Sequence, residues 1–434
     1  MNEHDYHPRT ELTEISERGM MDRLAEREHA FGIVSMEQLK TPQDRLGQYS
    51  RLEKMIGSTP LDSMRLENGV TIWLKRESEN PTESHYDRVS VAILKRLEMK
   101  GFVKPGDRIL EGTSGSAGRS FAWACSRLGF KLDIVVPHAD EIPSERVKDM
   151  KAFGANVIHA DEHGGIGKVT KKFRQIVVDL KNKGYQRKNC VLEGTPVIIF
   201  KRGKDTVIVP NHSENIITPS AFRAIAEEVV AQLPKGAKIN VFISTLGNGS
   251  TLKGISEGLR AAYGNVEIIG VEHRNSPTNA VRKLRKKFGE EKMREEFEKI
   301  YGFKMPEREE MTYHDSFGAS TPGYEPPFVE IDKIDGIVLV GDEWRDYKRR
   351  VNTYAWRHGN PRNLIGNTTA ENLYTALMLA KRQEMKGKSI LVINYDKADQ
   401  YADWPPQVRT YQHPLGKPKP EEIPYSVLTL KLGV

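Results

Sequence analysis

The sequence predicts an α/β protein with two lobes, in which each lobe is a parallel sheet covered by helices and a ligand cleft lies between them. Short, continuous apolar runs such as "LDIVVP" (132–137) and "VEIIGVE" (266–272) are typical of strands buried on both faces. These runs alternate with helix-type segments of ten to fifteen residues, which is the pattern of βαβ units. The alternation occurs in two sets along the chain and therefore predicts two lobes.

The expected elements divide the chain into four parts. Residues 1–50 are polar and helix-prone, and we expect a helical N-terminal extension that packs on the body or on a partner. Residues 51–210 form the first lobe, and residues 211–404 form the second, which carries a charged helical insert near 280–312. Residues 405–434 form a Pro-rich tail. The predicted strands are 107–111, 132–137, 156–160, 239–245, 266–272, 336–342 and 389–396.

Composition limits the class of protein. No stretch approaches the ~20 apolar residues that span a bilayer, and the first residues lack the apolar core of a secretory signal. The two cysteines, Cys125 and Cys190, lack a metal-binding or redox spacing, so we expect a cytoplasmic protein. The net charge is +7, but acidic residues are mixed through nearly every basic stretch, which disfavours a nucleic-acid partner. The strongest basic run, from Arg282 to Lys287, is interpreted as a solvated helix face, with a lid or docking surface as the alternative.

Two glycine-rich loops are the candidate binding elements. "GTSGSAG" (112–118) and "LGNGST" (246–251) each follow a predicted strand and open a predicted helix. Backbone N–H groups and the helix dipole attract an anion at such a position, and the Ser and Thr hydroxyls add donors. Neither loop is a nucleotide fingerprint, because Leu252 stands where a Rossmann motif needs its third glycine. In "GIGKV", Val169 stands where a P-loop needs Ser or Thr.

Two other kinds of site find little support. His159 and His163 in "HADEH" are four residues apart but lack the HExxH order, so we interpret them as surface histidines and predict no metal site. No GxSxG motif is present, so a hydrolase triad has no anchor in the sequence.

Several motifs, in order along residues 55–402, resemble those of one family. They are "IGSTPL" (56–61), "ENPTESHYDR" (79–88), "EGTSGSAGRSFAWACSRLG" (111–129), "STLGNGSTLKGISEGL" (244–259) and "LIGNTTAENLYTALMLA" (364–380). As an ordered set they resemble the pyridoxal-phosphate enzymes of fold type II, the cysteine-synthase and cystathionine-β-synthase-like group. The resemblance implies a fold like that of the tryptophan synthase β subunit, a small-molecule ligand in the cleft, and a homodimer.

The same resemblance implies three groups of binding residues. The substrate carboxylate would be held by Thr113, Ser114, Gly115 and Ser116. The cofactor phosphate would be held by Gly247, Asn248, Gly249, Ser250 and Thr251. The cofactor ring would be contacted by Ser116, which replaces the family's asparagine, and by Thr368 and Thr369 near the pyridine nitrogen.

The strongest departure from the family lies where the chemistry is. The family's loop reads Asn-Pro-Thr-Gly-Ser-Phe-Lys-Asp-Arg, and its lysine forms a Schiff base with the cofactor. This chain has Glu83 for the glycine, His85 for the phenylalanine and Tyr86 for the lysine. A phenol cannot condense with an aldehyde, so pyridoxal phosphate, if it binds, would be held without a covalent bond. Tyr86 and His85 are then the candidate catalytic acid–base residues, with a Tyr86 pKa lowered from ~10.

The retained residues of this loop also have a purely structural explanation. Ser84 can cap the following helix with Asp87 as its capping-box partner. Lys75, Lys201 and Lys253 are conceivable replacements for the missing amine, but no positional argument favours any of them.

Two functions are consistent with these observations. The first is an atypical lyase or transferase that binds an amino-acid-like or phosphorylated ligand in the cleft. The second is a catalytically inactive descendant that acts as a ligand sensor, scaffold or regulatory partner, with the N-terminal extension or the insert as the protein-binding segment. The loss of both the lysine and the asparagine favours the second function. The two retained loops of small and hydroxyl residues slightly favour the first.

Overall fold

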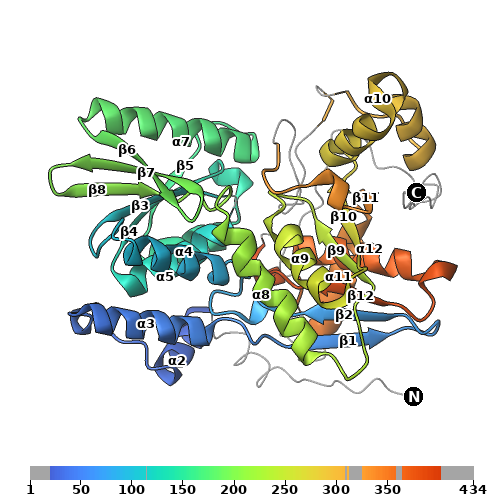
Figure 1. Cartoon of the computed structure of the whole chain (residues 1–434), viewed down its shortest axis with the longest axis horizontal. Helices are drawn as coiled ribbons and strands as arrows, with labels where there is room; N and C mark the ends of the chain where they lie inside the picture. Colours follow the sequence, from blue (N-terminus) through green and yellow to red (C-terminus); the bar gives the residue numbers. More distant parts are fainter. Residues whose placement is uncertain (1–19, 114, 308–309, 312–324, 358–363, 402–434) are drawn as a thin grey trace, which may run out of the picture.

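The computed structural model describes residues 20–113, 115–307, 310–311, 325–357 and 364–401 of the chain. Two six-stranded sheets organise these residues, and Figure 1 shows them side by side with helices packed against each. The fold is therefore α/β, with two mostly parallel sheets covered by helices, as the sequence predicts. Residues 1–19 and the expected Pro-rich tail, 405–434, lie outside the described residues.

The first sheet, called sheet I, comes from the N-terminal half of the chain. Its strands are β3 (Arg108–Gly112), β4 (Lys131–Val136), β5 (Asn156–His159), β6 (Gln186–Leu192), β7 (Thr195–Arg202) and β8 (Asp205–Val209). The strand order is β5-β4-β3-β8-β7-β6. The pairs among β5, β4, β3 and β8 are parallel, whereas β6, β7 and β8 form an antiparallel edge.

The second sheet, called sheet II, combines strands from both ends of the chain. Its strands are β1 (Leu61–Arg65), β2 (Thr71–Lys75), β9 (Val241–Thr245), β10 (Glu267–His273), β11 (Gly336–Val340) and β12 (Ser389–Ile393). The order is β1-β2-β12-β9-β10-β11, and all pairs are parallel except the β1–β2 hairpin. The sheets thus divide the chain differently from the expected boundary at residue 210. Strand β2 lies in the expected first lobe, but it pairs with β12, where Ile72 and Ile390 are both buried.

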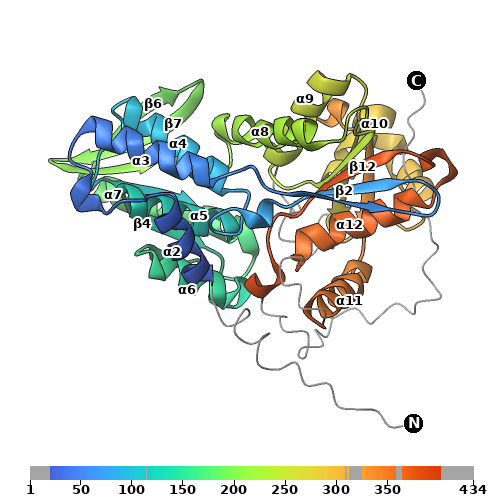
Figure 2. The ribbon, with the colours of Figure 1, turned by 90° about the horizontal axis from the view of Figure 1, so that it is seen from below.

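Helices cover both faces of both sheets. They are α4 (Asp87–Met99), α5 (Ser116–Leu128), α6 (Ser144–Ala152), α7 (Gly165–Asn182), α8 (Ile217–Gln232), α9 (Ser250–Tyr263), α10 (Thr278–Tyr301), α11 (Glu343–Arg357) and α12 (Asn367–Ala380). The largest apolar core contains side chains of α4, α5, α8 and α9 and joins the two sheets. A second core lies between sheet II and the helices α11 and α12, and a third between sheet I and α7. Figure 2 shows α11 and α12 on one side of sheet II and α8 and α9 on the other.

Side chains alternate between cores along the central strands. In β4, Ile134 and Val136 belong to the large core, whereas Val135 belongs to the core under α7. In β9, Phe242 belongs to the large core and Ile243 to the core under α12. Successive side chains of a strand point to opposite faces, so a strand covered on both faces is apolar throughout. This explains the continuous apolar runs in the sequence.

The described part of the N-terminal extension is helical and packs on the body of the protein. Helix α2 (Met20–Ala30) and helix α3 (Pro42–Met55) lie beside α4 and α5 (Figure 2). Tyr49 Oη donates to Glu98 Oε2 of α4 at 2.7 Å, and Arg45 pairs with the same carboxylate. Leu52 is fully buried in the large core. The extension is therefore bound to the lobe that carries the candidate site.

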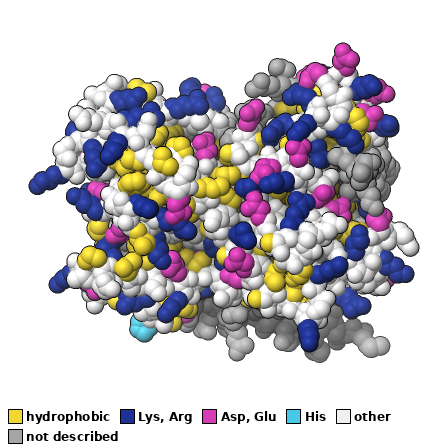
Figure 3. All heavy atoms as spheres, in the orientation of Figure 1, with side chains coloured by type: hydrophobic (Ala, Val, Ile, Leu, Met, Phe, Trp, Pro, Cys, Tyr) yellow, Lys and Arg dark blue, Asp and Glu magenta, His cyan; other side chains and the backbone are white. Residues whose placement is uncertain are grey.

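The charged insert is the kinked helix α10, and most cations of its basic run have partners. Lys283 is buried, and its Nζ donates to the backbone carbonyl of Ile334 at 2.5 Å. Arg285 pairs with Glu290 at 2.6 Å. On the face in Figure 3, Lys and Arg side chains are interspersed with Asp and Glu, so no area of a single charge dominates that face. No helix among the described residues is long and apolar enough to cross a membrane.

Candidate functional site

The candidate site is centred on residues 80–91, which comprise the loop between sheet II and α4 together with the start of α4. Asp87 holds the turn, because its carboxylate accepts the Thr82 N–H at 2.7 Å and the Thr82 hydroxyl at 2.5 Å. The expected capping box is therefore wrong. Asp87 is already the first helical residue and points back to Thr82, and the Ser84 hydroxyl accepts only the Tyr86 N–H at 3.2 Å. Tyr86 is the one residue of this segment that is not buried.

The Tyr86 ring is enclosed by aromatic side chains from three parts of the chain. Its centroid lies 4.4 Å from that of His85 and 5.7 Å from those of Phe222 and His212. Burial raises the pKa of Tyr86 to about 12. The expected lowering of this pKa is therefore wrong, because no cation among the described residues offsets the desolvation of the phenolate. Among the described residues the Tyr86 hydroxyl has no hydrogen-bond partner, so it is a neutral donor available to a ligand.

His85 connects this segment to the second glycine-rich loop. Its ring stacks on Phe222 at 4.8 Å, and its Nε2 lies 3.4 Å from Thr251 Oγ1. Nδ1 is buried, with no hydrogen-bond partner among the described residues. Burial lowers the pKa of His85 to about 3, so the imidazole is neutral at physiological pH. His85 can therefore bind a polar ligand atom but is not a cationic acid there.

A buried histidine that the sequence does not single out lies beside Tyr86. His212 follows β8, and Glu111 is the last residue but one of the neighbouring strand β3. Glu111 accepts the His212 backbone N–H and also lies 3.0 Å from Nδ1. A carboxylate can only accept, so Nδ1 carries the proton and Nε2 keeps its lone pair. Ser213 Oγ lies 3.5 Å from that Nε2.

The second glycine-rich loop has the geometry of an anion site. Gly249 has φ 85°, and α9 begins at the next residue, Ser250. Asn248 Oδ1 accepts the Ser250 N–H at 3.0 Å and the Ser250 hydroxyl at 2.7 Å, where an anion's oxygen would otherwise bind. The amide group of Asn248 also donates to the Ser213 carbonyl at 3.1 Å. Gly247 and Thr251 complete the loop, and Thr251 faces His85.

The first glycine-rich loop lies at the end of β3. Thr113 is buried, and its hydroxyl accepts the Gly115 N–H at 3.1 Å. The Ser116 hydroxyl donates to Asp396 at 3.4 Å, which connects the two lobes. The same carboxylate accepts from Arg146 Nη2 at 2.9 Å. Ser114, which is also predicted to bind the substrate carboxylate, lies outside the described residues.

The predicted pyridine-facing residues begin α12. Thr369 is buried; its hydroxyl donates to Asn394 Oδ1 at 3.1 Å and accepts the Tyr395 N–H at 3.0 Å. Thr368 is half-buried at the same helix end. The Tyr395 ring also lies 5.0 Å from that of His85. The structure therefore brings both glycine-rich loops, the Tyr86 segment and the start of α12 together.

The lysines considered as replacements for the missing amine are bound elsewhere. Lys75 Nζ is buried and donates to Glu228 Oε2 at 2.7 Å. Lys253 pairs with Glu257 at 2.7 Å, and Lys201 is exposed on β7. None of the three supports a covalent cofactor at this site.

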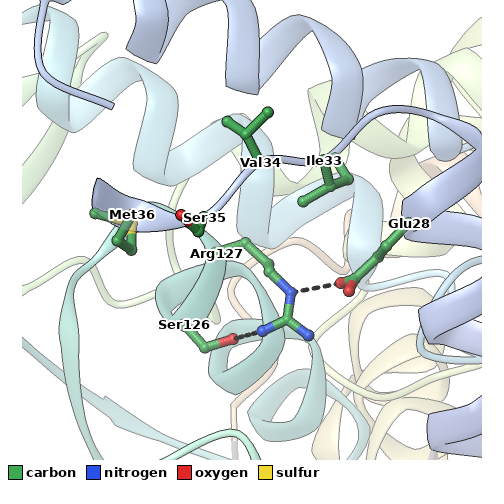
Figure 4. A pocket seen from close by; sticks show the side chains of 7 residues that line it. All are labelled: Glu28, Ile33, Val34, Ser35, Met36, Ser126 and Arg127. Atoms are coloured by element: carbon green, nitrogen blue, oxygen red, sulfur yellow. Dashed lines mark hydrogen bonds and ion pairs between the residues drawn. The ribbon is translucent and has the colours of Figure 1, made fainter. Parts of the chain in front are cut away.

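A cavity of about 290 Å³ lies away from these loops, between the N-terminal extension and α5 (Figure 4). Its lining consists of Glu28, Ile33, Val34, Ser35, Met36, Ser126 and Arg127. Arg127 donates to Glu28 Oε1 at 2.6 Å and to Ser126 Oγ at 3.1 Å, as Figure 4 shows. No predicted site residue lines this cavity, and its two charged side chains, Arg127 and Glu28, pair with each other. The cavity is therefore not the expected cleft between the lobes, and that cleft stays a prediction.

Comparison with known proteins defines the class of protein. A family model described as "Pyridoxal-phosphate dependent enzyme" matches residues 52–396, and the chain belongs to this family. Cysteine synthase of Staphylococcus aureus is 25% identical over 358 residues, which are 82% of this chain and 96% of the relative. Cysteine synthase B of Escherichia coli is 30% identical over 227 residues, or 51% of this chain and 65% of the relative.

Solved structures have the same fold. The crystal structure of cysteine synthase from Entamoeba histolytica has a TM-score of 0.61 at 22% identity and covers 83% of this chain and 92% of its own. That of O-acetylserine dependent cystathionine beta-synthase from Helicobacter pylori has a TM-score of 0.61 at 24% identity and covers 81% and 96%. The chain is thus cysteine-synthase-like in fold.

Membership of this family implies a pyridoxal phosphate cofactor, and the residues fit it in part. The N–H groups and hydroxyls that precede and open α9 suit a phosphate. The unpartnered Nδ1 of His85 suits a polar ring substituent. The residue at position 86, however, is a tyrosine, whose phenol cannot form an aldimine.

Proposed function

We propose that this protein is an atypical cysteine-synthase-like lyase or transferase that binds an amino-acid-like or phosphorylated ligand, with pyridoxal phosphate held without a covalent bond. One observation carries this proposal: Tyr86 is partly exposed and lies beside His85, which contacts Thr251 of the second glycine-rich loop, and beside His212. The loops retain small and hydroxyl residues that suit anions.

The binding roles follow from the donors of each loop. Residues 247–251 would hold a phosphate through N–H groups at the start of α9 and the hydroxyls of Ser250 and Thr251. A phosphate can bind the Ser250 N–H only if the hydrogen bond from this N–H to Asn248 Oδ1 breaks. The new hydrogen bond to the charged phosphate would offset the loss. Thr113, Ser114, Gly115 and Ser116 would hold a carboxylate.

The acid–base roles follow from protonation states. Pyridoxal phosphate, when bound, supplies an electron-accepting ring. Tyr86 stays protonated because burial raises its pKa to about 12, so it would donate a hydrogen bond or a proton. In the neutral His212 ring the proton lies on Nδ1, where Glu111 accepts it, so Nε2 is the nitrogen that would accept a proton. The pair thus offers one donor and one acceptor, and Tyr86 is the donor rather than the base.

The test is a titration with pyridoxal phosphate, followed by borohydride reduction and intact-mass analysis. We expect saturable binding by the wild type with no site-specific covalent adduct. Tyr86→Lys, which restores the amine, should give a single adduct at position 86. Tyr86→Phe is the matched control, because it keeps the ring and should bind without an adduct.

Two outcomes would contradict the proposal. An adduct of the wild type at one lysine would restore an ordinary covalent cofactor. Absence of binding by both the wild type and Tyr86→Phe would remove the cofactor from the proposal, and amino acids and phosphorylated compounds would then be tested alone.

A catalytically inactive sensor or scaffold is the second candidate, and the second loop carries it. Asn248 occupies the Ser250 N–H, and a Cβ at Gly249 would lie 2.6 Å from Val329. The loop is therefore partly occupied by Asn248 and packed closely against Val329. Ligand binding without turnover of any amino-acid substrate would favour this function. A homodimer, a cytoplasmic location and a protein partner of the N-terminal extension or of α10 stay predictions.

A further inference from the structure

Two histidines and one aspartate meet at the edge of sheet I, outside the site described above. His138 follows β4 and precedes the short 3₁₀ turn Ala139–Glu141, which contains Asp140. His163 lies between β5 and α7. Strands β4 and β5 are parallel neighbours, so the loops that follow them leave the sheet at the same edge. One ligand atom from each of the three residues lies within 4.8 Å of the others.

Both distances from the Asp140 carboxylate suit one tetrahedral metal ion. Asp140 Oδ2 lies 3.4 Å from His138 Nδ1 and 3.5 Å from His163 Nε2. Around a tetrahedral Zn²⁺ with bonds of about 2.0–2.2 Å, neighbouring ligand atoms lie about 3.3–3.5 Å apart. An octahedral Mg²⁺ would bring them to about 3.0 Å and prefers oxygen ligands. Two imidazoles and one carboxylate therefore suit zinc-like ions better than magnesium.

The two loops are already held together. Glu141 accepts the N–H groups of Gly164 and Gly165 at 2.7 and 3.0 Å, which ties the turn after β4 to the start of α7. His138 Nδ1 lies 3.4 Å from the Asp140 N–H, so it accepts and has the lone pair that ligation needs. The His138 and His163 ring centroids are 3.9 Å apart. The ligands are thus close together before any ion binds.

The neighbouring histidine is excluded as a ligand. His159 Nδ1 lies 3.0 Å from the carbonyl of Pro137 and is not part of the cluster. In the sequence, His163 is four residues from His159, and this spacing suggests these two as a pair of ligands. In the fold, His163 instead lies close to His138, which is 25 residues earlier in the chain. This distance along the chain is why the sequence predicts no metal site.

We propose that His138, Asp140 and His163 bind a divalent zinc-like cation with an open fourth position. The side chains of Asp140 and His163 are 77% and 63% exposed, so solvent can supply the fourth ligand. The ion would join the loops after β4 and β5 at the sheet edge where the Thr113 loop also begins. The site is independent of the proposed function.

The probe is Co²⁺, titrated into the metal-free full-length protein without a histidine tag. A tetrahedral Co²⁺ complex gives intense visible absorption, and Zn²⁺ should displace it. We expect one equivalent to bind, with at least about tenfold weaker binding in His138→Ala and in His163→Ala, since each variant loses one of three ligands. His159→Ala is the matched control and should bind as the wild type does.

The proposal is overturned if the wild type gives no tetrahedral Co²⁺ spectrum. It is also overturned if both histidine variants bind Co²⁺ as tightly as the wild type, because the ion would then be held elsewhere. The substituted histidines are not fully buried, and circular dichroism would verify that each variant folds.

Discussion

Glu83 lies in the loop that leads to Tyr86, and its substitution by glycine tests this part of the site most directly. Glu83 has φ 56°, a conformation that favours glycine by about 1 kcal/mol. Its buried carboxylate, however, accepts from Arg23 at 2.7 Å and from Lys397 at 3.0 Å. Lys397 is itself 10% exposed, and after Glu83→Gly it would keep Glu79 at 3.7 Å but lose the shorter pair with Glu83.

The magnitude follows from these opposing effects. Breaking a buried ion pair costs about 3–5 kcal/mol, and relief of the left-handed conformation returns about 1 kcal/mol. We expect Glu83→Gly to be less stable by about 2–4 kcal/mol. Glu193→Gly is the matched control, because Glu193 has φ 49° but pairs only with the exposed Arg96. Since an exposed pair contributes about 0.2–1 kcal/mol, the control should be as stable as the wild type or slightly more stable.

Urea unfolding of both variants at pH 7 measures the difference. Although burial alone would raise the pKa of Glu83, the charges of Lys397 and Arg23 lower it to about 2. A lowered carboxyl pKa contributes stability above about pH 4.5, and this contribution is lost as pH falls towards 2. The difference in unfolding free energy between the wild type and Glu83→Gly should therefore be constant from pH 7 to 5 and become smaller below pH 4.5. A Glu83→Gly variant as stable as the wild type at pH 7 would refute this reasoning.

Three further predictions test the loop, the buried histidine and a buried carboxyl. Gly249→Ala should lower the free energy of unfolding by at least about 2 kcal/mol, because φ at this position is 85° and the added Cβ would lie 2.6 Å from the Val329 side chain. Gly167→Ala is the control, because Gly167 is helical and open space surrounds it. In urea unfolding this control should be as stable as the wild type or more stable by up to about 1 kcal/mol. Nitrogen NMR should find His212 protonated at Nδ1, and Glu111→Gln should shift it towards the other tautomer; an unchanged spectrum would contradict the assigned role of Glu111. Burial raises the pKa of Glu272 from 4.5 to about 7. The wild type should therefore lose stability relative to Glu272→Gln as pH rises from 4.5 through 7. A wild type that gains stability over this range would contradict the raised pKa of Glu272.

Local patterns of the sequence predict the loops well. Each glycine-rich loop lies between a strand and the helix that directly follows it. A segment of about fifteen residues is therefore enough to predict where the loop lies. The retained glycines at 115 and 249 have positive φ values of 149° and 85°, which few other residues adopt. Tyr86 likewise lies at the start of α4, as the motif order indicates.

Contacts between distant residues were not predictable in the same way. Strand β2 joins β12 across more than three hundred residues, so no local pattern indicates its sheet. The raised pKa of Tyr86 depends on Phe222 and His212, which come from another part of the chain. Only the packed structure shows that the phenol is desolvated without a nearby cation.

Glu83, His85 and Tyr86 each have partners elsewhere in the chain. A carboxylate buried without a cation would cost several kcal/mol, but Glu83 has both Arg23 of the extension and Lys397. His85 and Tyr86 likewise fill an aromatic cluster rather than a void. Because Arg23 belongs to α2, the N-terminal extension itself stabilises the loop that carries Tyr86.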